Sequence, residues 1–409
     1  MLINTMPLPI ALFDTLEQLS AKDYSIPSCF NQSDWKHAYR FILSYRGSID
    51  TFNAYRREIE RLLQWVFLIS KKPLAGIRRA DFEEYLSFCQ NPPLSWIGLL
   101  HVPRFLDQNG KRVPNPAWRP FVATSSKNSS KNAENPAKNY KFSKKAFQQI
   151  MVISSSFFNF LIHEGATEIN PVLQIRQKNK FLPSSATKLT VRRLSELQWS
   201  YVIETAELMA KERPEDHERT LFIMNALYGM YLRISELVAT PRWEPQMKDF
   251  HRDSDGNWWF TTIGKGNKQR QIAVSNQMLE ALKRYRISLS LSPLPSPHES
   301  IPLISKYKGS DPLKSTRRLR GIVQECFNVA IERLEKDGLI EDVEALKNAT
   351  VHWLRHTGIS EDVKNRPREH VRDDAGHASG AITDRYIDVE LRERHASARK
   401  KLIKPDFLD

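Results

Sequence analysis

Apolar residues recur at helical spacing through most of this chain, and a single short strand–turn–strand pattern interrupts them. In the first half, Tyr55, Ile59 and Leu62 fall on one face of a predicted helix. In the second half, residues 258–263 read as a strand, and residues 270–274 read as its return partner across a glycine-containing turn. These two periods predict a mainly helical fold with a small antiparallel β-sheet in the second half.

Composition and proline positions divide the chain into parts. We predict an N-terminal extension over residues 1–40, a helical domain over 41–176, a linker over 177–191 and a second domain over 192–409. The second domain contains the predicted hairpin, whereas the first is expected to be nearly all helix. The chain is therefore expected to fold as two domains.

Capping residues and apolar periods also predict individual helix boundaries. Asp50 or Thr51 is the expected cap of the first long helix, and Asp81 is the expected cap of a helix that ends near Gln90. In the second domain, one buried helix is expected from about His217 to Ala239.

Residues 91–142 form a proline-rich, basic insertion in the first domain. Between His101 and Lys180, thirteen Lys or Arg residues stand against four Asp or Glu residues. The insertion is either a solvated loop or a flexible basic segment that lies on phosphates, and the sequence leaves both open.

The formal net charge of +14 is expected of a protein that meets a polyanion, most commonly a nucleic acid. Three widely separated cysteines show no metal-ligand or disulfide spacing, which favours a reducing, intracellular compartment. We expect no signal peptide, no membrane span, no metal and no cofactor.

Four stretches of the second domain contain the same few residue types. The first is LYGMYLRISELVAT, the second is the turn IGKGNKQRQIAV, the third is VHWLRHT, and the fourth is AGHASGAITDRYID. Together they contribute a cationic set with one nucleophile: Arg233, Glu236, Lys265, His352, Arg355, His377 and Tyr386.

Such a set suits attack on a phosphodiester. Arginine offers a fork of donors that matches two phosphate oxygens, so two arginines can stabilise charge that develops in the transition state. A tyrosine hydroxyl is mostly protonated at neutral pH, and a neutral histidine can accept its proton. A lysine on a hairpin turn can protonate the leaving oxygen.

The four stretches resemble the boxes of the tyrosine recombinases, or phage integrase family. That family's pattern has an Arg in a GLRxSEL-like box, a Lys in a GKG-like turn, an HxxR pair, a Gly-His pair and a Tyr nine residues after that His. All appear here in order. The resemblance is good from about Leu194 to Asp388 and looser in the first domain, which is similar to the family's helical SAM-like core-binding domain.

The resemblance implies a role for each matching residue. Tyr386 would form a 3′-phosphotyrosine, while Arg233 and Arg355 clamp the non-bridging oxygens. Lys265 would act as general acid and His352 as the acid/base for the tyrosine proton. His377 would donate a hydrogen bond to the phosphate, and Glu236 would support the site.

The resemblance also implies partners. Expected are double-stranded DNA with specific recombination sites, a homotetramer on two such sites, a Holliday junction, and accessory DNA-bending or directionality factors. The expected location is the bacterial cytoplasm, in association with the nucleoid, and the chain length points to a mobile genetic element. The tail after Tyr386 packs either on its own domain or on a neighbouring protomer.

The sequence departs from the family's pattern in two places. The segment between Arg355 and His377 contains Pro367 and a charged Asp373–Asp374 pair. The spacing from Arg233 to Lys265 is long, and strands and turns between about residues 243 and 257 are expected to hold the extra residues.

Two other functions use related features. A type IB topoisomerase-like enzyme would relax DNA with the same chemistry and without partner sites. A non-catalytic DNA-binding accessory protein would have no need of Tyr386. Relaxation that does not depend on a site would favour the first, and DNA binding without any cleavage would favour the second.

Overall fold

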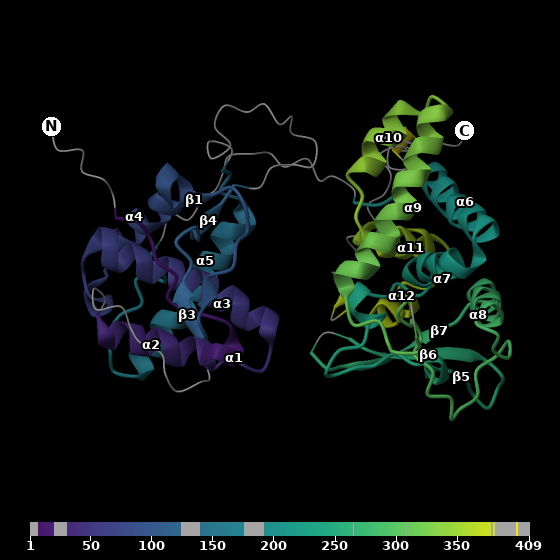
Figure 1. Ribbon diagram of the computed structural model, residues 1–409, viewed down its shortest axis with the longest axis horizontal. Helices are drawn as coiled ribbons and strands as arrows, with labels where there is room; N and C mark the ends of the chain where they lie inside the picture. Colours follow the sequence, from purple (N-terminus) through teal and green to yellow (C-terminus); the bar gives the residue numbers. More distant parts are fainter. Residues whose placement is uncertain are drawn as a thin grey trace, which may run out of the picture. The chain divides into compact units, whose positions relative to one another are not determined.

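The structure is a computed structural model that describes residues 7–19, 31–123, 140–175, 192–264, 266–307, 309–377, 379–380 and 398–399. The chain divides into two compact units, Met1–Thr187 and Lys188–Asp409, and each has its own hydrophobic core (Figure 1). None of the helices in these ranges is long and apolar enough to span a bilayer.

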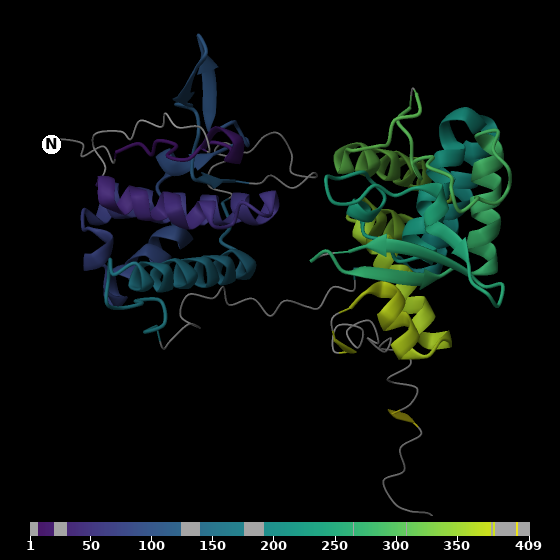
Figure 2. The ribbon, with the colours of Figure 1, turned by 90° about the horizontal axis from the view of Figure 1, so that it is seen from below.

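The first unit is built around two helices that lie side by side, α3 and α5 (Figure 2). Aromatic side chains fill the space between its helices, and Phe52, Phe82 and Phe157 are fully buried. Its helices are α1 (Leu16–Leu19), α2 (Gln32–Leu43), α3 (Ile49–Trp65), α4 (Arg79–Gln90) and α5 (Lys144–His163), with short helical turns η1 (Val66–Ser70), η2 (Leu74–Gly76) and η3 (Leu94–Trp96).

Two of the predicted caps were wrong. Ser48 caps α3, since its hydroxyl accepts a hydrogen bond from the backbone N–H of Thr51. Asp81 lies inside α4 rather than before it, and its carboxylate accepts a hydrogen bond of 2.8 Å from the backbone N–H of Arg78. An acidic residue in the first helical turn can reach back to the cap in this way, so the sequence signal was shifted along the chain.

Part of the predicted insertion is folded onto the core of the first unit. It forms β1 (Ile97–Gly98) and β4 (Phe121–Val122), which pair in parallel, and the antiparallel hairpin β2 (Phe105–Gln108) and β3 (Lys111–Pro114). The hairpin stands out from the helices in Figure 2. Trp96 and Phe121 are buried in the core, so residues 94–123 are more than a solvated loop. Residues 124–139 of the insertion lie outside the described ranges.

The second unit consists of a group of helices with a three-stranded sheet at one end (Figure 1). The helices are α6 (Glu196–Glu212), α7 (Pro214–Gly229), α8 (Asn276–Ser288), α9 (Thr316–Lys336), α10 (Ile340–Lys347), α11 (Val351–Asn365) and α12 (Arg368–Ala375), with short turns η6 (Ile234–Glu236) and η7 (Met247–Asp249). The strands are β5 (Phe250–Arg252), β6 (Trp258–Ile263) and β7 (Gln269–Ala273), in the antiparallel order β5-β6-β7.

The predicted hairpin is confirmed as β6 and β7. Phe260 in the central strand is fully buried, and it lies opposite Phe250 on one side and Ile272 on the other. β5 falls in the stretch where extra strands and turns were expected. This mainly helical fold with a small antiparallel sheet is the predicted fold class.

The helix predicted from His217 to Ala239 is instead α7, which ends at Gly229. Tyr231 follows in the left-handed backbone region at a φ of 49°, which ends the helix. The apolar period continues past this point because residues 230–232 are buried in the core without being helical. Arg233 therefore lies after the helix, at the start of η6.

Candidate active site

Arg355 is a buried arginine in the middle of α11, with a relative exposure of 5%. Its guanidinium donates hydrogen bonds to the backbone carbonyl of Tyr231 and, at 2.6 Å, to that of Ala375. It also lies 3.3 Å from Nε2 of His377. Arg355 therefore joins the segment after α7 to the end of α12, and it is not part of a solvated helix face.

Arg233 begins the η6 turn and reaches the same region from the other side. Its Nη1 donates to Glu236 at 3.0 Å, and its Nη2 donates to the carbonyl of Gly376 at 3.4 Å. The backbone N–H of Arg233 donates to the other oxygen of Glu236 at 2.8 Å. The Arg233 side chain is 29% exposed, so part of it is accessible from solvent.

Glu236 is the buried anchor of this cluster. Its side chain is 2% exposed, and both of its oxygens accept hydrogen bonds of 2.8 Å from the two Nη atoms of Arg270 on β7. Burial alone would raise the pKa of this carboxyl, but the ion pairs with Arg270 and Arg233 hold the pKa below its usual value. Glu236 is thus a carboxylate that orients two arginines.

Arg270 also ties the sheet to the α12 end. Its Nε donates to the carbonyl of Asp374 at 3.0 Å. Gly376 packs against it, because a Cβ at Gly376 would lie 2.8 Å from Cδ of Arg270. Gly376 has a φ of 62°, which ends α12 and suits glycine. Arg270 therefore contacts the turn that carries His377.

The base of the β6–β7 turn lies on the same cluster. A Cβ at Gly264 would lie 3.0 Å from Nη1 of Arg270, 3.3 Å from Glu236 and 3.5 Å from Nη1 of Arg233. The residue that follows, Lys265, lies outside the described ranges. The residue before it, Gly264, rests directly against the arginines.

The departures around Pro367 have a local explanation. Pro367 separates α11 from α12 and occupies the N-cap of α12, where its missing N–H costs nothing. Asp374 is buried, accepts a 2.6 Å bond from Arg366, and accepts a hydrogen bond of 3.2 Å from the backbone N–H of Ala273 on β7. The charged pair thus supplies one residue that fastens α12 to the sheet.

His377 directly follows Gly376, the residue that ends α12. Burial, together with the positive charges of Arg355 and Arg233, lowers its pKa to about 4. The imidazole is therefore neutral at pH 7. Because Arg355 can only donate, Nε2 of His377 accepts from it, and the ring proton lies on Nδ1. Nδ1 is then a hydrogen-bond donor.

Two further histidines share this positive surrounding. His352 is exposed at the start of α11, and partial burial with the charges of Arg320, Arg355 and Arg233 lowers its pKa. Burial and Arg355 also lower the pKa of His356 to about 4. A neutral imidazole at His352 can accept a proton at neutral pH.

The structure thus brings together Arg233, Glu236, Arg355 and His377, with His352 on the same helix as Arg355. Tyr386, like Lys265, lies outside the described ranges. Sequence reasoning missed the role of Arg270, although its place in the return strand after the GKG turn was visible. Within the described ranges, no group of three or more His, Cys, Asp or Glu residues could hold a metal ion.

The chain is similar in sequence to tyrosine recombinases. Residues 189–393 match the phage integrase family. A tyrosine recombinase XerD of Rickettsia prowazekii is 31% identical over 134 residues, which cover 32% of this chain and 39% of that protein. A tyrosine recombinase XerC of Pediococcus pentosaceus is 25% identical over 258 residues, which cover 60% of this chain and 71% of that protein.

Solved structures match over nearly the whole chain. The XerH site-specific recombinase in a post-cleavage complex with a palindromic difH substrate matches with a TM-score of 0.51 at 16% identity, over 91% of this chain and 90% of that one. The Tn1549 transposon integrase with a circular intermediate DNA matches with a TM-score of 0.53 at 15% identity, over 90% and 98%. At this identity they show a shared fold. With its arginines, histidines and family match in place, the chain belongs to the phage integrase family, the tyrosine recombinases.

Proposed function

We propose that this protein is a site-specific DNA recombinase that cuts and rejoins DNA through Tyr386. The observation that carries the proposal is the meeting of three side chains at the end of α12. Arg233 donates to the carbonyl of Gly376, and Arg355 donates to the carbonyl of Ala375 and lies 3.3 Å from the ring of His377. These groups supply two guanidinium donors and one neutral ring donor around one point. A phosphodiester group at that point would meet donors on several of its oxygens.

The reaction exchanges one phosphoester for another. The hydroxyl oxygen of Tyr386 attacks the phosphorus and forms a phosphoester bond to the phosphate at the 3′ end of one DNA fragment. The bond from this phosphorus to the 5′ oxygen of the other fragment breaks, and that oxygen takes up a proton. His352 accepts the tyrosine proton and Lys265 donates the proton to the leaving oxygen. The phosphotyrosine retains the energy of the broken bond, so a 5′ hydroxyl from another strand can reverse the reaction.

Arg233 and Arg355 clamp the non-bridging oxygens in this scheme, and His377 donates through Nδ1. Arginine suits this task because its planar fork stays charged at all relevant pH values. Glu236 does not react. Its carboxylate, held between Arg233 and Arg270, keeps the first of these oriented toward the phosphate.

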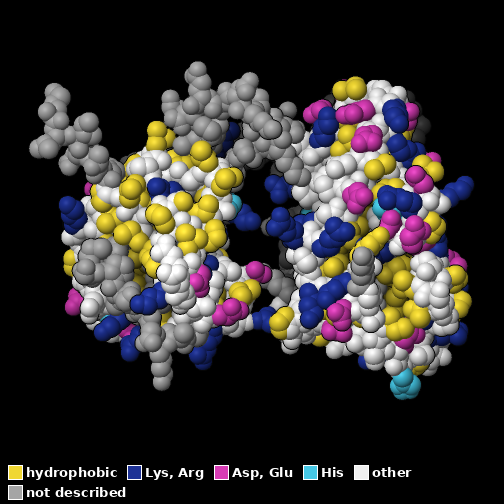
Figure 3. All heavy atoms as spheres, viewed as in Figure 1, with side chains coloured by type: hydrophobic (Ala, Val, Ile, Leu, Met, Phe, Trp, Pro, Cys, Tyr) yellow, Lys and Arg dark blue, Asp and Glu magenta, His cyan; other side chains and the backbone are white. Residues whose placement is uncertain are grey.

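The proposed substrate is double-stranded DNA with specific recombination sites. The net charge of +14 supports it, and Lys and Arg side chains gather along one edge of the second unit on the face drawn in Figure 3. We further propose that residues 41–176 and 192–409 act as the two halves of a DNA clamp, that four protomers act on two sites through a Holliday junction, and that the substrate is a mobile element. The fold shared with a transposon integrase supports the last point.

Covalent capture tests the proposal. The protein and a Tyr386→Phe variant are expressed in cells that carry candidate target DNA, lysed in denaturant without a crosslinker, and purified. Any attached DNA is then sequenced. DNA attached to the wild-type protein and absent from the variant is the expected result, and the attached sequence identifies the site.

A Tyr386→Phe variant that captures or recombines DNA as efficiently as the wild-type protein would contradict the proposed nucleophile. Glu280→Gln provides a control, because Glu280 is exposed and, within the described ranges, forms its ion pair with Lys283 on its own helix. This variant is expected to capture DNA as the wild-type protein does.

A further inference from the structure

A basic pocket of about 270 Å³ lies in the first unit, between α3 and the folded part of the insertion. None of the described residues that line it is acidic. The polar residues of its lining are Asn53, Arg56 and Arg57 from α3, and His101, Arg104 and Arg119 from the insertion. The pocket therefore combines a core helix with a segment that was predicted as an insertion.

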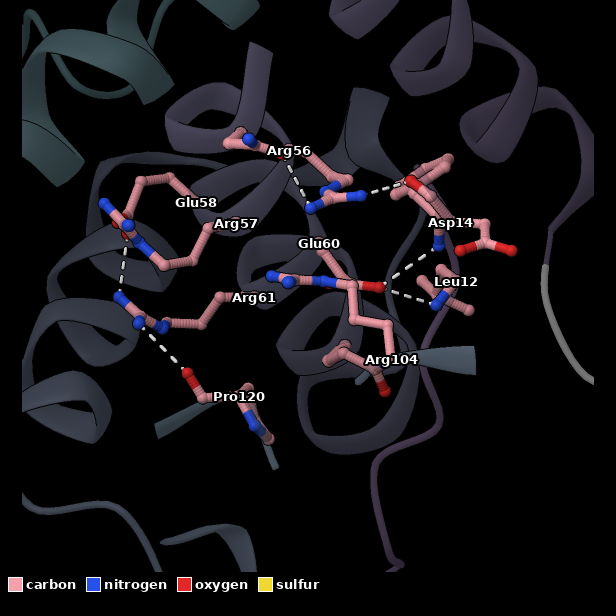
Figure 4. Close-up of polar contacts among 12 residues, drawn as sticks. Leu12, Asp14, Arg56, Arg57, Glu58, Glu60, Arg61, Arg104 and Pro120 are labelled. Carbon is pink, nitrogen blue, oxygen red and sulfur yellow. Dashed lines mark hydrogen bonds and ion pairs between the residues drawn. The ribbon is translucent and has the colours of Figure 1, made fainter. Parts of the chain in front are cut away.

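Buried carboxylates bind two of these arginines, Arg57 and Arg104 (Figure 4). Glu58 accepts from Arg57 at 2.8 Å and from Arg61 at 2.7 Å. Glu60 is fully buried, accepts from Arg104 at 2.9 Å, and also accepts from the backbone of residues 12 and 13. Because each carboxylate is buried and bonded, the arginine stems have a fixed support.

The cluster as a whole is positive. Asp14 is also buried, and both of its oxygens accept from Arg112, while its carbonyl accepts from Arg56. Four of the six arginines here thus pair with three carboxylates, namely Arg57, Arg61, Arg104 and Arg112. The other two, Arg56 and Arg119, donate hydrogen bonds to backbone carbonyls. Excess positive charge on a rigid support attracts an anion.

Arg119 lines the pocket from the folded part of the insertion and makes backbone contacts. Its Nη1 donates to the backbone carbonyls of Pro116 and Trp118, both at 2.7 Å. Within the described ranges, no ion pair neutralises it. Arg57, which lines the pocket from α3, pairs with Glu58 and donates to Gln149 at 3.0 Å, and its side chain is 42% exposed.

The rim of the pocket has the character of a surface that meets a ligand. Leu100 is 76% exposed next to the exposed His101. An apolar rim beside basic side chains suits a chain of phosphates and deoxyriboses.

We propose that this pocket holds a backbone phosphate of duplex DNA, as a contact separate from the phosphate that Tyr386 attacks. The inference rests on the proposed function, because it takes DNA as the substrate. Arg57 from α3 and Arg119 from the folded part of the insertion both line the pocket, and guanidinium donors suit phosphate oxygens. Such a contact carries no base readout and fixes the position of the domain along the duplex.

The proposed phosphate contact is tested by measuring how salt changes DNA binding by the full chain. The DNA is a labelled 40-base-pair duplex of mixed sequence, about four helical turns long. Arg119→Gln removes one charge without stranding a buried carboxylate. It is expected to reduce the slope of log K against log salt by about 0.9 and to weaken binding about tenfold at about 0.1 M salt. Arg119→Lys keeps the charge and should restore most of the slope.

Arg40→Gln is the matched control. Arg40 is 68% exposed in the same unit, pairs with Glu164, and does not line the pocket. An Arg119→Gln slope equal to those of Arg40→Gln and the wild-type protein would overturn the inference while leaving the proposed function intact. Absence of salt-dependent binding by the wild-type protein would overturn both. Tight binding of inorganic phosphate alone that Arg119→Gln abolishes, with an unchanged DNA slope, would indicate a small-anion site and also overturn it.

Discussion

Arg270 and Glu236 form a two-point ion pair, with both Nη–Oε distances at 2.8 Å. The pair lies next to Gly264, at the base of the β6–β7 turn. Glu236 is 2% exposed and Arg270 is 10% exposed. The pair joins β7 to the η6 turn and, through a backbone carbonyl, to the end of α12. The η6 turn, the base of the β6–β7 turn and the end of α12 therefore all contact this one pair. Arg355 on α11 reaches the same cluster through the backbone carbonyl of Ala375.

Replacing Arg270 is expected to destabilise the second unit strongly. Arg270→Met leaves the buried Glu236 with Arg233 alone, and breaking such a buried pair costs about 3–5 kcal/mol of unfolding free energy. Denaturant unfolding of the full chain, followed through the transition of the second unit, measures the loss.

The control for this prediction is Arg284→Met. Arg284 also makes a two-point pair, with Glu218, but its side chain is 45% exposed. Exposed pairs contribute only about 0–1 kcal/mol. Equal losses of unfolding free energy in the two variants would contradict the prediction that the buried pair stabilises the protein more than the exposed pair.

Gly264 is expected to limit how the turn sits on the arginines. A Cβ in Gly264→Ala would lie 3.0 Å from Arg270 and 3.3 Å from Glu236, so the turn must shift by a few tenths of an ångström. Lys265, the proposed proton donor, follows Gly264 in the chain. Displacement of this donor by such an amount should slow DNA cleavage about tenfold while DNA affinity is retained. Single-turnover cleavage and equilibrium binding on the captured site separate these effects, and a parallel loss of affinity would count against the explanation.

Gly358 allows α11 to approach α7 closely. A Cβ at Gly358 would lie 2.1 Å from the carbonyl oxygen of Tyr228, which is backbone and cannot rotate away. Gly358→Ala should therefore cost about 3 kcal/mol of unfolding free energy. Gly321→Ala on α9 is the control, since no atom lies within 4 Å of its added Cβ, and it should stabilise by about 0.5–1 kcal/mol. Similar unfolding curves for both variants would contradict the predicted overlap.

Stability should fall as the pH falls from about 6.5 to about 4. The pKa of His377 is about 4 in the folded protein, against about 6.5 for an ordinary histidine, so the unfolded chain binds a proton in this window that the folded protein does not. This contribution is fully present above pH 6.5 and is lost as the pH falls. Thermal unfolding of wild-type protein and His377→Asn across this range tests the assignment, because the variant's curve should be flatter. An unchanged pH dependence would mean that the histidine is not held neutral.

The fold class and the hairpin could be predicted because they depend on local periods. The alternation in residues 258–263 and the turn at Gly256 follow from sequence neighbours alone. The end of α7 could not be predicted in this way, because residues 230–232 are buried and apolar whether or not they are helical. Tertiary burial overrode the helical period at this point.

The site was predictable in its residue types and less so in its supports. Arg233, Glu236, Arg355 and His377 are recognisable from motif order. The partners of Arg270 are 34 and 104 positions away along the chain, so no local pattern shows that it anchors the cluster. The burial of Arg56 and Arg61 in the first unit was equally hidden, because the segments that cover them come from other parts of the chain.

The central claim is that Tyr386 forms the bond to DNA, and peptide mapping of the covalent complex tests it most directly. Purified protein is incubated with the captured site, digested with a protease and a nuclease, and analysed by mass spectrometry. The account predicts one nucleotide attached through its 3′ phosphate to Tyr386. An adduct on another residue, or cut DNA with no attached protein, would contradict it.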